Sequence, residues 1–110
     1  MPRDVIAEAD WKVLRRAHPL ALERFCERVL GEVERVMRNR EQTHHQRYLA
    51  VFELVQRRDR DMARLFDNPR RSQALTMLAH MRSEGVLTQE EFSSLSPQTR
   101  SAVERLLGAG

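Results

Sequence analysis

The sequence predicts an all-α protein, a small antiparallel helical bundle of three longer helices closed by two or three shorter C-terminal helices. Apolar residues recur at three- and four-residue spacing along most of the chain, which is typical of amphipathic helices. Two capping boxes and two helix-starting prolines mark where such segments begin. The chain has 110 residues, 41% apolar and 32% charged, which fits one domain of thin helices with one buried stripe each.

Six helical segments are expected within this single domain, residues 1–110. They span about 4–17, 20–38, 43–66, 69–84, 89–94 and 97–107. Pro19 separates the first two, because proline lacks an N–H and clashes with the preceding helical turn. It either begins a new helix at its first position or kinks one long helix.

The segment 20–38 carries its apolar residues as a heptad seam. The seam consists of Leu22, Cys26, Val29, Val33 and Val36, flanked by Phe25, Leu30 and Met37. It is too short for a free-standing coiled coil, so it must dock on a helix of the same chain or of a second copy. Gly31 lies within it and is expected to permit a close helix crossing. Cys26, the single cysteine, is expected to be a buried and inert thiol.

The segment 43–66 is the central amphipathic helix, and Thr43 with Gln46 forms its capping box. Its predicted apolar stripe is made of Tyr48, Val51, Phe52, Val55, Met62, Leu65 and Phe66. Residues 48–55 are expected to dock on the N-terminal helices and residues 62–66 on the C-terminal ones. Arg58 and Asp59 interrupt the stripe between them. We expect Asp59 either to pair with an arginine at a helix junction or to face a partner.

The C-terminal third contains three helix starts. Asn68 is expected as the cap of the segment 69–84, with Pro69 at its first position and Gly85 ending it. Thr88 and Glu91 form the second capping box, around which Leu87 and Phe92 form a hydrophobic staple. Ser96 and Pro97 begin the last helix.

Residues 75–92, LTMLAHMRSEGVLTQEEF, resemble the short C-terminal helical segment known as SHOCT. The similarity consists of a helix followed by GVLT and then EEF, and it covers less than a fifth of the chain. The chain continues with SSLSPQTR, where that segment usually carries basic residues. The resemblance implies an interaction or assembly element.

The sequence carries no recognisable catalytic, cofactor or metal motif. The four histidines (His18, His44, His45 and His80) form no HExxH pattern, and adjacent helical residues point about 100° apart. No apolar run approaches the ~20 residues of a membrane span. We therefore expect a cytoplasmic protein without catalytic residues, cofactor, metal, membrane partner or small-molecule substrate. An enzyme would need a pocket with two polar groups near His44, His45 or Asp59.

Basic residues gather between positions 57 and 71. The candidate contact residues for a partner or nucleic acid are Arg57, Arg58, Asp59, Arg60, Arg64, Arg70 and Arg71. This stretch is either a patch for an acidic partner or a solvated face with internal ion pairs. The preferred hypothesis is a non-catalytic protein–protein interaction or assembly module that forms a homo-oligomer. The alternative is a nucleic-acid-binding protein that uses the arginine cluster.

Overall fold

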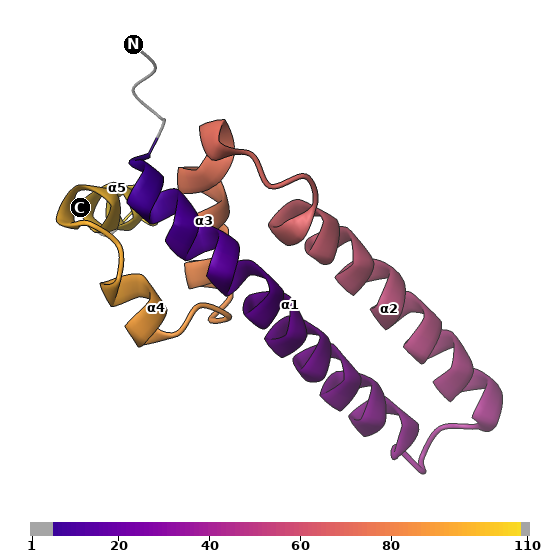
Figure 1. Ribbon diagram of the computed structural model, residues 1–110. Helices are drawn as coiled ribbons and strands as arrows, with labels where there is room; N and C mark the ends of the chain where they lie inside the picture. Colours follow the sequence, from indigo (N-terminus) through magenta and orange to yellow (C-terminus); the bar gives the residue numbers. More distant parts are fainter. Residues whose placement is uncertain (1–5, 109–110) are drawn as a thin grey trace.

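The computed structural model describes residues 6–108 and confirms the all-α bundle within them. In chain order the elements are α1 (Glu8–Met37), α2 (His44–Phe66), the 3-10 helix η1 (Arg71–Gln73), α3 (Ala74–Ser83), α4 (Gln89–Ser93) and α5 (Pro97–Leu106). Figure 1 shows α1 and α2 as a long antiparallel hairpin, with α3, α4 and α5 gathered around the N-terminal half of α1. The molecule is elongated, 57 × 26 × 24 Å.

Pro19 lies inside α1 and begins no separate helix, so the segments expected at 4–17 and 20–38 are one helix. Pro19 and Arg15 are both exposed. The carbonyl of Arg15, which loses its helical partner to the proline, therefore lies on the solvent side, where water can satisfy it. The opposite side of the helix is held by core packing on both sides of the proline, through Ala17 and Ala21.

The hydrophobic core lies at the base of the hairpin, where α1, the end of α2 and the C-terminal helices meet. Its fully buried members come from all three parts of the chain and include Leu14, Ala21, Phe25, Leu65, Leu78, Met81, Val86 and Val103. Phe66 packs edge-on against Phe25, with ring centroids 5.7 Å apart. His18 also packs edge-on against the Phe66 ring, and its Nε2 lies 2.9 Å from the Phe66 carbonyl oxygen.

Polar contacts fasten the C-terminal helices to α1. The Asp10 carboxylate accepts hydrogen bonds from the Ser96 backbone N–H (2.8 Å), the Ser96 hydroxyl (2.7 Å) and the Thr99 hydroxyl (2.6 Å), at the start of α5. Arg24 binds Glu91 at 2.8 and 3.1 Å and donates to the Val86 carbonyl at 2.9 Å. These long-range contacts join residues separated by more than sixty positions.

The connection between α2 and α3 differs from the expected helix start. Asn68 adopts a left-handed conformation (φ 51°), Arg70 is extended, and the helix begins as η1 at residue 71. Asn68 and Pro69 are therefore not the cap and first position of a helix over 69–84. The Arg71 guanidinium donates to the Ile6 carbonyl at 3.0 and 2.9 Å, which ties this connection to the residues preceding α1. Asparagine tolerates the left-handed region better than most residues.

The other helix boundaries follow the predicted caps. Both capping boxes are present, with the Thr43 and Thr88 side chains accepting from the third helical N–H. The Ser96 side chain caps α5 with Pro97 at its first turn. Gly85 ends α3 with φ 73°, which favours glycine.

Candidate functional site

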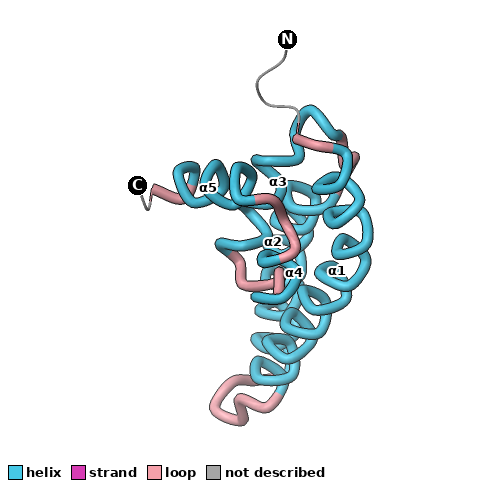
Figure 2. The backbone as a smooth tube through the Cα atoms, turned by 60° about the vertical axis from the view of Figure 1, so that its left-hand side comes forward, coloured by secondary structure: helices cyan, strands magenta, loops and turns pink. Residues whose placement is uncertain are grey.

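The outer half of the α1–α2 hairpin projects beyond the C-terminal helices. Figures 1 and 2 both show α3, α4 and α5 at one end of the molecule and the turn between α1 and α2 at the other. The buried residues of α1 end at Phe25, twelve residues before the helix ends. Arg28 still donates to the Glu84 and Gly85 carbonyls, but beyond it each helix has, among residues 6–108, only the other helix as a neighbour.

α2 does not turn its predicted stripe toward α1. Leu54, which is not part of that stripe, is buried, while Tyr48, Phe52 and Val55 are exposed. Residues 48–55 do lie against α1 as predicted, but through Ala50 and Leu54 and not through Tyr48, Phe52 and Val55 of the predicted stripe. Residues 62–66 were predicted to dock on the C-terminal helices, and Leu65 and Phe66 do lie in the core that these helices share with α1. The side of α2 that faces α1 could have been predicted from Ala50, Leu54 and Leu65, because their separations of 4 and 11 residues place them on one side of a helix.

Five exposed and two half-buried apolar residues lie along one side of the outer hairpin, a surface here called the hairpin face. It comprises Leu30, Val33 and Met37 of α1 and Tyr48, Val51, Phe52 and Val55 of α2. Leu30 and Tyr48 are each 67% exposed, and Phe52 is 48% exposed. Spacings of three and four place each set along one side of its helix. Met37, Tyr48 and Val51 line the same hollow, so the two sets meet on one side of the hairpin.

That hollow, about 300 Å³, lies near the tip of the hairpin and also includes His44 and Arg47. Its lining contains two basic polar side chains, His44 and Arg47, so it has the two polar groups that an enzyme was expected to need in a pocket near His44. However, Arg47 bonds His44 Nδ1 at 2.8 Å and the Met37 carbonyl at 2.7 Å. The lining contains no carboxylate or thiol beside the imidazole. In this hollow the arginine links the two helices across the turn.

A charged network lies between the two helices where the α2 stripe is interrupted. Arg58 binds the Glu32 carboxylate at 2.9 and 2.8 Å and Asp61 at 2.9 Å, and Arg64 adds a contact to Asp61 at 3.2 Å. The hydrogen bond from Arg58 lowers the pKa of the Glu32 carboxyl and raises the pKa of Arg58. Arg58 thus joins α1 to α2 within the fold, and sequence reasoning missed Glu32 as its partner.

Asp59 lies on the same side of α2 as the hairpin face. It is exposed and makes no ion pair or side-chain hydrogen bond within residues 6–108. It follows Val55 by four residues and precedes Met62 by three, so it continues the line of the face. Of the two expectations for Asp59, pairing with an arginine is not observed among residues 6–108. Its neighbours Arg58 and Asp61 make the junction instead.

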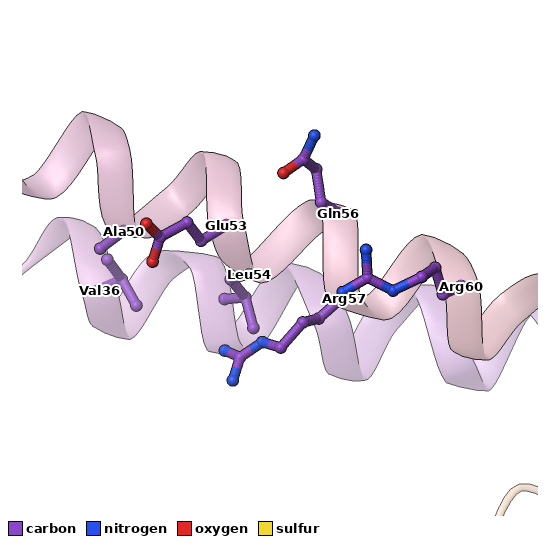
Figure 3. Close-up of a pocket in the computed structure, with 7 residues that line it drawn as sticks. All are labelled: Val36, Ala50, Glu53, Leu54, Gln56, Arg57 and Arg60. Atoms are coloured by element: carbon purple, nitrogen blue, oxygen red, sulfur yellow. The ribbon is translucent and has the colours of Figure 1, made fainter.

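The other flank of the hairpin is polar. A groove of about 440 Å³ lies there. Figure 3 shows the residues that line it: Val36 of α1 and Ala50, Glu53, Leu54, Gln56, Arg57 and Arg60 of α2. Arg57 and Arg60 are exposed. They lie about 100° or more around α2 from Val55, on the side away from the hairpin face.

The predicted arginine cluster is divided among different roles. Arg58 and Arg64 bind carboxylates of the same chain, and Arg71 holds the Ile6 carbonyl. Arg57 and Arg60 lie on the polar flank, and the exposed Arg70 belongs to the connection before η1. The structure therefore leaves three of the six arginines without an ion pair or side-chain hydrogen bond among the described residues.

The remaining sequence candidates are spread over the molecule. Cys26 is partly exposed, so the expectation of a buried thiol is wrong; its helix passes the edge of the core at this point. An added Cβ at Gly31 would have nothing within 4 Å, so this glycine serves no close helix crossing in the part of the chain that the structure describes. No metal-binding group of His, Cys, Asp and Glu exists within residues 6–108, and no helix there is long and apolar enough to cross a membrane.

No protein-family model, curated protein or solved structure matches this chain.

Proposed function

We propose that this protein is a small, non-catalytic, cytoplasmic protein–protein interaction or assembly module that binds its partner through the hairpin face. The observation that carries the proposal is the exposure of large apolar side chains from two helices on one side of the outer hairpin. Contiguous exposed apolar surface of several hundred Å² is typical of interaction sites on soluble proteins.

The distribution of packing supports this role. The core at the base already fixes the fold, so the residues of the hairpin face are not needed to hold the C-terminal helices. Tyr48 and Phe52 are aromatic, and aromatic side chains are enriched at the centres of interfaces. The SHOCT-like segment at 75–92 points to the same class of function through its resemblance.

Site-specific photo-cross-linking in the native host tests the proposal. A photo-reactive residue at Phe52 or Val55 is expected to form protein adducts, because these side chains would lie inside the interface. The same residue at Glu53 or Arg60, on the polar flank, is the matched control and is expected to give few adducts. Equal or absent cross-linking at both sets would overturn the proposal.

Nucleic-acid binding is the second candidate. Arg57 and Arg60 support it, since they are exposed side by side at the polar groove. Three other arginines of the cluster are engaged within the chain, which reduces the charge available for phosphates. Salt-titrated binding to mixed DNA and RNA tests it: affinity that falls with salt and is lost in Arg57→Ala/Arg60→Ala would favour it.

A further inference from the structure

We infer that the hairpin face binds a second copy of this chain, and that the two hairpins pair antiparallel along α2 into a four-helix bundle. This inference rests on the proposed function and names the partner. A two-fold pair uses the same patch on both copies, so the patch must be complementary to itself.

The apolar residues of α2 meet that requirement. Tyr48, Val51, Phe52 and Val55 are placed symmetrically about the midpoint between Val51 and Phe52. When two α2 helices run antiparallel through this midpoint, Tyr48 of one copy lies opposite Val55 of the other, and Val51 lies opposite Phe52. Large side chains then face smaller ones in each pair, which favours close packing.

Charge supports the same arrangement. The symmetry that pairs Tyr48 with Val55 also places Asp59 of one copy opposite His44 of the other. His44 is bonded to Arg47, so the Asp59 carboxylate would meet a basic group at the hairpin tip. A parallel pair would instead place the two Asp59 carboxylates together, and like charges at an interface oppose association. The exposed position of Asp59 on the line of the face thus favours the antiparallel orientation.

The exposed area of the face reaches the lower limit for a specific pair. Each of the five most exposed side chains of the face (Leu30, Met37, Tyr48, Phe52 and Val55) offers on the order of 100 Å². Two copies would then bury about 1,000 Å² through these side chains alone, the lower limit for a specific interface. Half-buried Val33 and Val51 and the polar rim add to this area.

Sedimentation velocity of the purified full chain, from micromolar to millimolar concentration, tests the pairing. We expect a concentration-dependent dimer. Phe52→Glu should raise the dissociation constant by about thirtyfold or more, because it places a charge at the centre of the interface. Arg60→Glu, an exposed substitution on the polar flank, is the matched control and should leave the dimer unchanged. Circular dichroism confirms that both variants stay folded.

Cysteine cross-linking tests the orientation. In a Cys26→Ala background, Tyr48→Cys chains mixed with Val55→Cys chains should form disulfides between the two variants. A parallel pair would give only disulfides within each variant, and that result would overturn the antiparallel arrangement.

Two failures are distinguishable. A chain that is monomeric at every concentration overturns the self-pairing; if Phe52 still cross-links to another protein in cells, the proposed function stands. A monomeric chain without cross-links at Phe52 overturns both.

Discussion

Asp10 is 2% exposed and brings a carboxylate into the base of the hairpin. Burial opposes its charged form, but the hydrogen bonds from Thr99 and Ser96 outweigh burial, so the pKa of Asp10 lies below its ordinary value of 3.8. Three donors satisfy the carboxylate where it would otherwise be costly to bury. One side chain thereby fixes the start of α5 against the start of α1.

We expect Asp10→Asn to lower the free energy of unfolding at neutral pH by about 3 kcal/mol, because the amide replaces an acceptor that three donors require. Urea denaturation measures the loss. Glu8→Gln, an exposed change on the same helical turn, is the control and should shift the free energy by less than about 0.5 kcal/mol.

The same carboxylate makes stability depend on pH. A lowered folded pKa adds stability above the unfolded pKa of about 3.9, and this stability is lost as the pH falls through the folded value. The wild type should therefore lose stability more steeply than Asp10→Asn below about pH 4. Glu32 and Glu91 also have lowered pKa values, so the variant keeps part of the slope. Identical slopes would contradict the lowered pKa, since they would mean that Asp10 has the same pKa in the folded and the unfolded state.

At the scale of single elements, α1 and α2 each carry two different faces. The part of α1 up to Phe25 buries side chains in the core, and Arg24 and Arg28 bond the C-terminal segment, whereas the turns after Arg28 lie beside α2. On the side of α2 that faces α1, Leu54 is the one buried residue before Leu65. The Glu32–Arg58 ion pair adds a polar contact between the two helices. The more apolar side of α2, which carries Tyr48, Phe52 and Val55, is exposed. Each of the two helices thus keeps exposed apolar side chains among residues 6–108.

Gly31, inside α1, and Gly85, just after α3, are expected to respond in opposite ways to substitution by alanine. Gly31→Ala should raise the free energy of unfolding by about 0.5–1 kcal/mol, since the added Cβ meets nothing within 4 Å and alanine favours the helix. Gly85→Ala should lower it by about 1 kcal/mol, because φ 73° strains a side-chain-bearing residue. Thermal unfolding of both variants measures the pair. A destabilising Gly31→Ala would instead indicate a contact made by a partner at this position.

At the scale of the whole molecule, the protein consists of a packed base and a projecting two-helix arm. The base contains the core cluster and the long-range polar contacts of Asp10, Arg24 and Arg71. The arm carries the hairpin face and few buried residues. A binding surface on such an arm is accessible without rearranging the core.

Hydrogen exchange should separate the two parts. In dilute solution we expect amides of residues 33–52 to exchange through local opening, and those of α3 and the first half of α1 only through global unfolding. Raising the protein concentration should protect the arm selectively, since a second copy would cover it. Uniform protection along both helices at low concentration would contradict this division.

The fold class, the capping boxes at Thr43 and Thr88, and the glycine end at Gly85 could all be predicted from the sequence. These features depend on local spacing and backbone conformation, which neighbouring residues control. Periodicity also identified the apolar residues of α2, but it does not specify which neighbour covers them. Three features could be seen only in the folded chain: Pro19 lies within a helix, Arg58 pairs with Glu32, and Tyr48, Phe52 and Val55 face outward. These outcomes depend on which distant segments meet, and packing at the base of the hairpin settles that choice.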